Sequence, residues 1–129
     1  MPVLPSFLYV AIGGALGACL RYATLLCVDR LTLFPLPYAT LCVNVLGSFL
    51  MGLTATYLMQ TANPISSLHP FIIVGVLGGY TTFSSFSLDL WQFWNDGQMM
   101  HLLLYGMGSV ILSFIAMVAG MACIRGVLS

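Results

Sequence analysis

The chain has 129 residues, of which 60% are hydrophobic and only 5% carry a charge. Its three arginines balance three acidic residues, and it contains neither lysine nor glutamate, so the net charge is zero. A water-soluble domain of this size would expose many more charges, so the composition excludes that class and predicts a membrane protein. A neutral chain also lacks the basic surface that binds nucleic acid, so no nucleic-acid partner is expected.

Four apolar segments are long enough to cross a bilayer, which takes about 20 mainly apolar residues. They cover, approximately, residues 7–28, 38–59, 71–94 and 102–128. The connections between them are short, and Pro35 and Pro37 stop the helix before the second segment begins. Because no connection can hold a folded domain, we expect a single all-α membrane domain over residues 1–129, with its function inside the membrane.

Each segment contains two small residues four positions apart, a spacing that lets helices approach closely in lipid. The pairs are Gly13 with Gly17, Ser48 with Gly52, Gly75 with Gly79, and Ala116 with Gly120. Packing within one subunit and packing between subunits are both open for each pair. Their presence in all four segments predicts a compact bundle with more packing surface than a single subunit can use.

The arginines give no preferred orientation in the membrane. Four spans put both chain ends on one side, with Arg125, and the first connection on the other side, with Arg30. An excess of Lys and Arg marks the cytoplasmic side, and here the two sides are equal. Arg21 lies inside the first segment, so it does not count toward either side of the membrane. We therefore expect that the chain inserts in both orientations and assembles as an antiparallel homodimer.

The third segment is not an ordinary span. Residues 75–87 read GVLGGYTTFSSFS, in which two adjacent glycines are followed by five hydroxyl residues within seven positions. Inside the hydrocarbon, non-helical backbone is tolerated only against protein or a wet cavity. We interpret this stretch as a helix that breaks and lines a polar path.

Polar side chains in the other spans could line the same path. Arg21 lies inside the end of the first segment, where a charge is either functional, paired or extended toward the interface. Asn44, in the second segment, offers two amide hydrogens either to another helix or to a pore. Ser109 and Ser113 are four apart in the fourth segment, and Tyr105 extends the same helix face.

Two phenylalanines accompany the hydroxyl residues of the third segment. Phe83 and Phe86 are three apart, so they share a helix face, beside Ser84 and Ser85. An aromatic ring has a negative face and a positive edge, so ring edges can line the path of an anion without trapping it. The spans hold almost no carboxylate, whereas a cation path would normally use carboxylates or rings of carbonyls. The donor-rich inventory therefore favours a small anion, which composition alone does not name.

The sequence contains no arrangement that is typical of an enzyme, because its histidines lack a neighbouring nucleophile and no loop has phosphate-binding spacing. We therefore expect no enzymatic activity. One alternative function is a small dual-topology exporter of organic cations. Proton-coupled export needs a carboxylate embedded in the early spans, however, and the first two contain no glutamate. A non-transporting membrane accessory subunit is another alternative, but it does not explain the hydroxyl row and paired phenylalanines.

Three motifs, in this order, resemble those of the small fluoride channels of the Fluc/CrcB type. Residues 13–22 (GGALGACLRY) are similar to the family pattern GGxxGAxxRY/W. Residues 40–47 (TLCVNVLG) are similar to GTLxVN(L/V)xG, and residues 75–87 to GxxGGxTTFSTFS. The resemblance covers nearly the whole chain.

The resemblance implies passive, selective fluoride efflux across the cell (inner) membrane, through two pores lined by both subunits of an antiparallel dual-topology homodimer. It implies roles in the fluoride path for Asn44, Phe83, Ser84, Ser85, Phe86, Ser109 and Ser113, with Tyr105 nearby and Arg21 beside the vestibule. These roles are expectations carried over by matching position in the motifs.

The resemblance also implies a structural sodium ion on the dimer axis, held by the backbone carbonyls of Gly78 and Thr81 from each subunit. A helix break frees carbonyls from helical hydrogen bonds, and carbonyl oxygens suit a hard cation. The sequence departs from the family at three positions. Ser85 replaces the usual Thr but keeps the hydroxyl, Asp89 shortens the reach of the usual Glu, and Tyr80 places a hydroxyl beside the expected sodium site.

Overall fold

The computed structural model describes residues 3–31, 37–61 and 68–128, and all the regular elements within these ranges are helices. The elements are α1 (Val3–Leu31), α2 (Tyr38–Gln60), η2 (Pro70–Leu77), α3 (Gly78–Tyr80), α4 (Phe83–Asn95) and α5 (Met99–Leu128). The expected all-α fold is confirmed. The four expected segments fall on α1, on α2, on the run of η2, α3 and α4, and on α5, with Thr81 and Thr82 of the third segment outside the helices. The connections around Pro35 and Asn63 lie outside the described residues.

Four helical stretches are long and apolar enough to cross a membrane, and together they make the chain a multi-pass membrane protein. They cover Pro5–Leu31, Tyr38–Gln60, Pro70–Asn95 and Met99–Val127. Large apolar side chains such as Leu16 and Phe114 are exposed on the outside of the bundle. Such a surface is stable in hydrocarbon and would aggregate in water.

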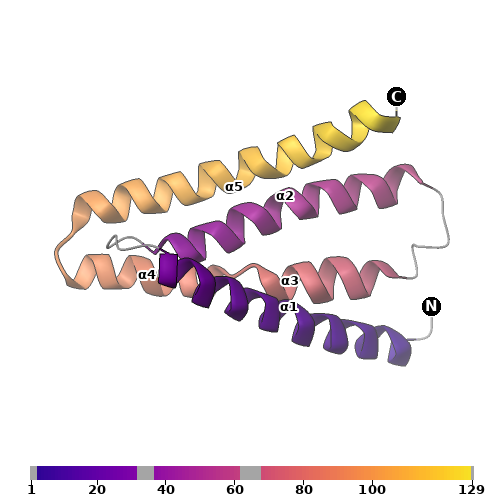
Figure 1. Ribbon diagram of the computed structural model, residues 1–129, viewed down its shortest axis with the longest axis horizontal. Helices are drawn as coiled ribbons and strands as arrows, with labels where there is room; N and C mark the ends of the chain where they lie inside the picture. Colours follow the sequence, from indigo (N-terminus) through magenta and orange to yellow (C-terminus); the bar gives the residue numbers. More distant parts are fainter. Residues whose placement is uncertain (1–2, 32–36, 62–67, 129) are drawn as a thin grey trace.

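The bundle has two layers. Helices α2 and α5 lie side by side in one layer, while η2, α3 and α4 follow one another in the other layer, which α1 crosses (Figure 1). The two ends of the chain lie at the same end of the bundle, as an even number of spans requires (Figure 1). The layer of η2, α3 and α4 therefore contains the helix break, and the layer of α2 and α5 faces it.

Glycines bring two pairs of helices into backbone contact. A Cβ atom on Gly17 would overlap the carbonyl oxygen of Val76 and lie 2.9 Å from the nitrogen of Tyr80. A Cβ atom on Gly52 would likewise overlap the carbonyl oxygen of Met117. We name these contacts the α1–η2 seam (Gly13 and Gly17 of α1 with Gly75 of η2 and Gly79 of the adjoining α3) and the α2–α5 seam (Gly52 and Gly120). Both seams lie within one subunit, so of the two alternatives for these glycines, packing within one subunit is present, and the additional packing surface for a second subunit stays a prediction.

The third span is interrupted at Thr81 and Thr82. Thr81 has φ −76° and ψ 155°, and Thr82 has φ −149° and ψ 121°, so both residues have extended backbone between α3 and α4. This geometry is consistent with the break expected from the glycines and hydroxyl residues. Before the break, η2 is wound as a π-helix, and the N–H of Gly78 donates to the carbonyl of Ile73, five residues earlier.

A tight turn joins α4 to α5. Gly97 has φ 70°, a conformation that residues with a Cβ rarely adopt. The N–H of Gln98 donates to the Phe93 carbonyl at 2.8 Å, and the N–H of Gly97 donates to the Trp94 carbonyl at 3.1 Å. These two bonds form a Schellman motif, which reverses the chain and lays α5 against α4.

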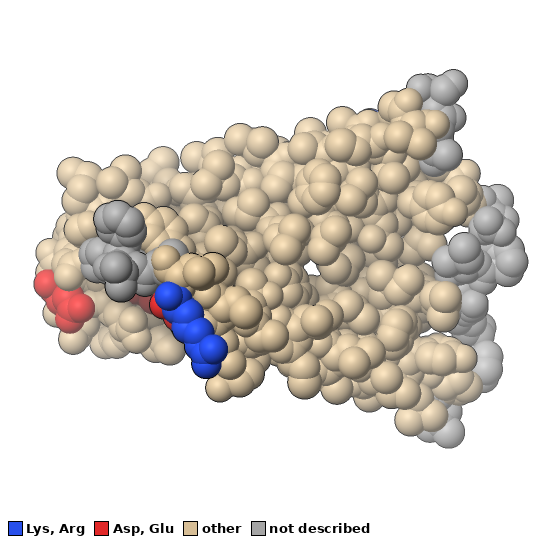
Figure 2. Space-filling view, in the orientation of Figure 1, with Lys and Arg blue, Asp and Glu red and all other residues tan. Residues whose placement is uncertain are grey.

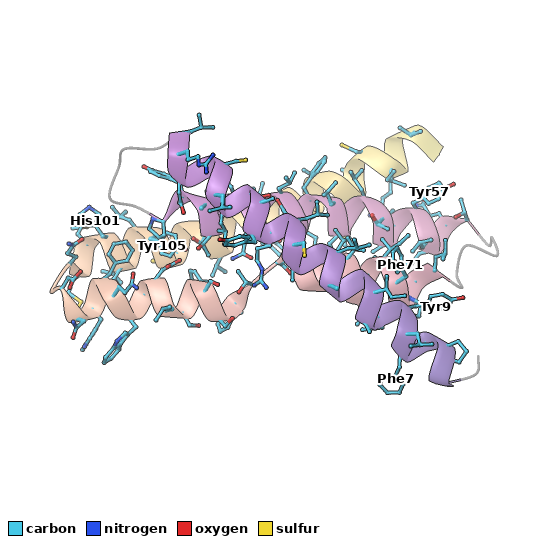
Figure 3. All side chains as sticks on the ribbon, turned by 60° about the horizontal axis from the view of Figure 1, so that its bottom comes forward. Phe7, Tyr9, Tyr57, Phe71, His101 and Tyr105 are labelled. Atoms are coloured by element: carbon cyan, nitrogen blue, oxygen red, sulfur yellow. The ribbon has the colours of Figure 1, made fainter. Side chains whose placement is uncertain are left out.

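Charged and aromatic side chains are found toward the ends of the bundle. On the face shown in Figure 2, charged side chains gather toward the end opposite the chain termini, and most of the surface is uncharged. Figure 3 shows Phe7, Tyr9, Tyr57 and Phe71 toward the end that carries the termini and His101 toward the other end. Aromatic residues are enriched at both interfaces of membrane proteins, so this distribution fits a bundle that crosses the bilayer along its length.

Candidate functional site

A groove of about 300 Å³ opens at the helix break. It is lined by Asn44, Ser48, Thr81, Thr82, Phe83, Phe86, Ser109, Val110 and Ser113, which come from α2, the break, α4 and α5. The lining offers one amide, five hydroxyl groups and two aromatic rings, and it contains no acidic or basic side chain. The sequence predicted a donor-rich, acid-poor path, but it did not assign four of these lining residues to it: Ser48, Thr81, Thr82 and Val110.

Asn44 is bonded to the broken backbone at two points. Its Nδ2 donates to the carbonyl oxygen of Thr82 at 2.9 Å, and its Oδ1 accepts the N–H of Thr82 at 2.8 Å. Thr82 lies outside any helix, so its buried backbone groups need partners from elsewhere. The sequence left two roles open for the Asn44 amide, a hydrogen bond to another segment or a donor facing a pore. The hydrogen bond to another segment is present. It uses one Nδ2 hydrogen, and the described residues offer no partner to the second, which can donate into the groove.

Thr82 is the N-cap of α4. Its Oγ1 accepts the N–H of Ser85 at 3.1 Å and donates to the Ser85 Oγ at 3.2 Å. The Ser84 Oγ lies 3.2 Å from the same oxygen. Because Thr82 has a single hydroxyl hydrogen, Ser84 is the donor in that contact. Ser84 and Ser85 are thus tied to the cap, and neither belongs to the groove lining.

Ser109 is the most unusual polar group in the groove. The residue is only 5% exposed, and its Oγ has no hydrogen-bond partner among the described residues. Leaving a buried hydroxyl unsatisfied costs about 1–3 kcal/mol. Ser113, four residues later, also lines the groove. Ser109 therefore presents an unused donor at the place where a bound species would lie.

The two phenylalanines have different environments. The rings of Phe83 and Phe86 are in contact, with centroids 5.6 Å apart and planes at 51°. Phe83 is 77% exposed, whereas Phe86 is 7% exposed and packs against Tyr105, with centroids 5.5 Å apart. Phe86 thus forms the inner wall of the groove, and Phe83 extends out of the subunit.

Two other residues assigned from the sequence, Tyr105 and Arg21, do not line the groove, although Tyr105 packs against the lining residue Phe86. The hydroxyl of Tyr105 donates to the Asp89 Oδ2 at 2.8 Å, so its hydrogen is already used. Tyr105 lies toward the end of the bundle that also carries His101 (Figure 3). Arg21 is half-buried on α1. Asp89 replaces the usual Glu of the family and has a shorter side chain. Its carboxylate nevertheless reaches the Tyr105 hydroxyl.

The hydroxyl of Tyr80 is directed toward α1. It lies 3.2 Å from the Thr24 Oγ1, which in turn donates to the Leu20 carbonyl. Tyr80 is buried, so this contact satisfies a polar group inside the bundle. Thr24 was not identified from the sequence, because nothing in its segment marks it as the partner of a residue so distant along the chain.

The carbonyls expected to hold a cation lie on either side of Tyr80. Gly78 is exposed on α3, and Thr81 is the first residue with extended backbone. Backbone carbonyl oxygens are ligands that suit a hard cation. Their placement at the break fits the expected sodium ligands, and the ion itself stays a prediction.

Comparison with known proteins agrees with the motifs. A family model described as "CrcB-like protein, Camphor Resistance (CrcB)" matches residues 8–121, which include the break and the whole groove. The chain is 42% identical to "Fluoride-specific ion channel FluC" of Hahella chejuensis, over 97% of this chain and 98% of the relative. It is 46% identical to the protein of that name from Rhizobium meliloti, over 92% of this chain and 94% of the relative. The protein therefore belongs to the CrcB-like family.

Proposed function

We propose that this protein is a fluoride-selective channel that gives passive fluoride efflux across the cell (inner) membrane. The groove carries the proposal, because it offers hydroxyl and amide donors and two aromatic rings without an acidic or basic side chain. Ser109 adds a buried donor that has no hydrogen-bond partner among the described residues. Relatives that match nearly the full length are named as fluoride-specific ion channels, which supports the same function here.

The lining suits the chemistry of fluoride. This ion is small and strongly hydrated, so a path through hydrocarbon must replace its water with other donors. Fixed positive charges would hold it too tightly, since conduction needs sites that are favourable enough to enter and weak enough to leave. Hydroxyl donors at Ser109 and Ser113, the free hydrogen of the Asn44 amide and the ring edge of Phe83 provide weaker contacts.

A second, antiparallel copy of the chain would complete the pathway. The groove is open on one side, and the ring of Phe83 projects from the subunit. We propose that the partner covers this face, so that the dimer has two pores, each lined by both chains. The carbonyls of Gly78 and Thr81 from both chains would hold a sodium ion, which would link the two helix breaks electrostatically.

Fluoride release from liposomes tests this function. We expect the purified protein to discharge a fluoride gradient and to leave a chloride gradient intact. Phe83→Ile removes the ring edge while keeping an apolar side chain, and we expect it to slow fluoride efflux severalfold. Phe114→Ile is the matched control, because Phe114 is an exposed residue of α5 outside the groove.

The liposome experiment can also reject the proposal. A folded protein that discharges no fluoride would return us to the accessory-subunit function. Rapid efflux that is equally fast in Phe83→Ile and in the parent would keep the channel but remove that ring from the path.

Labelling of a single cysteine tests the dual orientation. The four native cysteines are free, so they are first replaced, and Gln98 in the exposed α4–α5 turn is changed to Cys. We expect a membrane-impermeant thiol reagent to label this position both in intact cells and in inverted membrane vesicles. Labelling from one side alone, with a control protein of known orientation behaving normally, would contradict the antiparallel dimer.

A further inference from the structure

Side-chain oxygens capture two backbone N–H groups at the break. In an uninterrupted α-helix, the N–H of Thr82 would donate to the carbonyl of Gly78, and the N–H of Ser85 would donate to the carbonyl of Thr81. Here the N–H of Thr82 donates to the Asn44 Oδ1 at 2.8 Å. The N–H of Ser85 donates to the Thr82 Oγ1 at 3.1 Å. Each captured N–H is the regular helical partner of one of the two carbonyls.

The same two captures therefore release both carbonyls. Gly78 and Thr81 are the residues whose carbonyl oxygens are placed in the proposed sodium site. An unsatisfied carbonyl inside a membrane is costly, and a hard cation is a partner that satisfies it. Capture of the N–H groups and availability of the carbonyls are thus two consequences of the same hydrogen bonds.

We infer that Asn44 and Thr82 are positioning residues for the cation site, because they divert the N–H groups that would otherwise occupy the carbonyls of Gly78 and Thr81. This inference rests on the sodium site of the proposed function. Neither side chain contacts the ion in this arrangement. Each acts through the backbone, Asn44 from α2 and Thr82 from the cap of α4.

Asn44 and Thr82 together stabilise the non-helical backbone at the break. Asn44 also donates to the Thr82 carbonyl at 2.9 Å, so Thr82 cannot rotate to return its N–H to Gly78 without breaking two bonds. Thr82 is 6% exposed, and its hydroxyl is fully used by Ser84 and Ser85. A side chain without an oxygen at position 82 would free the N–H of Ser85 to pair with the Thr81 carbonyl, which would extend α4 by one residue toward its N-terminus.

Sodium-dependent stability provides the test. A ligand that binds the folded state alone raises the thermal midpoint in proportion to RT ln(1 + [L]/Kd). The purified protein is titrated with sodium against N-methylglucamine at constant chloride and ionic strength, and the half-saturating sodium concentration is read from the midpoints. For Thr82→Val and Asn44→Ala we expect this concentration to rise at least fivefold. Thr82→Ser keeps the capping oxygen, so it should match the parent.

Thr54→Val is the matched control. The Thr54 hydroxyl donates to the Leu50 carbonyl at 2.8 Å, so this change removes a threonine hydroxyl from a membrane helix without touching the break. We expect the half-saturating sodium concentration of this variant to equal that of the parent. A rise as large as that of Thr82→Val would overturn the inference, because any lost hydroxyl would then have the same effect.

Other outcomes separate this inference from the proposed function. A folded Thr82→Val that binds sodium as the parent does would overturn the inference. A parent that moves fluoride but is not stabilised by sodium would overturn it too, while leaving the channel intact. A parent that sodium stabilises but that moves no fluoride would reject the channel, and the variants would still decide the positioning roles.

Amide hydrogen exchange in the parent covers the case in which the variants do not fold. In sodium-free buffer, we expect the N–H groups of Thr82 and Ser85 to exchange slowly, because their side-chain partners protect them without the ion. Exchange as fast as that of an open amide at both positions would overturn the inference.

Discussion

Replacing Gly17 with Ala is expected to destabilise the folded protein strongly. The added Cβ atom would overlap the carbonyl oxygen of Val76 and lie 2.9 Å from the nitrogen of Tyr80. Both neighbours are backbone atoms, so the clash cannot be relieved by rotating a side chain. We expect a loss of roughly 3 kcal/mol or more, the upper end for overpacking, because α1 must separate from η2. The yield of folded protein in size-exclusion chromatography and the thermal midpoint measure this effect.

Gly14→Ala is the control for that prediction. Gly14 lies on the same helix, and a Cβ atom added there would meet no other described segment of the subunit within 4 Å. We expect this variant to fold with nearly the midpoint of the parent. Equal stability of Gly17→Ala and the parent would show that the α1–η2 seam is looser than the structure describes.

Ser109→Ala is expected to slow fluoride efflux by about 10- to 100-fold without loss of stability. A hydrogen bond to a charged group contributes about 1.5–3 kcal/mol, and each 1.4 kcal/mol is about a tenfold effect. The same change removes a buried hydroxyl that has no partner within the described subunit, so the thermal midpoint should stay equal or rise. Liposome efflux and thermal unfolding, measured on one preparation, give both quantities.

Ser87→Ala is the control that shows whether slower fluoride efflux is specific to Ser109 or follows from the loss of any serine hydroxyl. Ser87 is exposed on α4, its hydroxyl donates to the Phe83 carbonyl at 2.9 Å, and it lies outside the groove lining. We expect efflux within twofold of the parent, on the scale of small surface effects. A Ser109→Ala protein that loses stability but conducts normally would assign Ser109 to packing.

The spans and the position of the break could be predicted because both depend on local composition. Long apolar runs give membrane helices regardless of what packs against them. Two glycines followed by clustered hydroxyl residues weaken a helix at one place, and the extended residues Thr81 and Thr82 come one residue after Gly78 and Gly79. The hydroxyl row on α5 was predictable for the same reason, since a spacing of four residues fixes a shared face.

Partners distant in sequence could not be predicted in the same way. The bonds from Asn44 to Thr82, from Tyr105 to Asp89 and between Tyr80 and Thr24 join segments whose relative rotation depends on tertiary packing. Helical spacing put Phe83 and Phe86 on one face, but only the packing of α5 shows that Phe86 is covered.

The interruption at Thr81 and Thr82 has an electrostatic consequence for the middle of the membrane. Aligned peptide dipoles give a helix about half a negative charge at its C-terminus and half a positive charge at its N-terminus. An unbroken span shows these partial charges only at the two water interfaces. Here the C-terminal end of η2 and α3 meets the N-terminal end of α4 inside the bundle. One break therefore brings both signs of partial charge into the middle of the bundle, beside a groove whose lining contains no ionisable side chain.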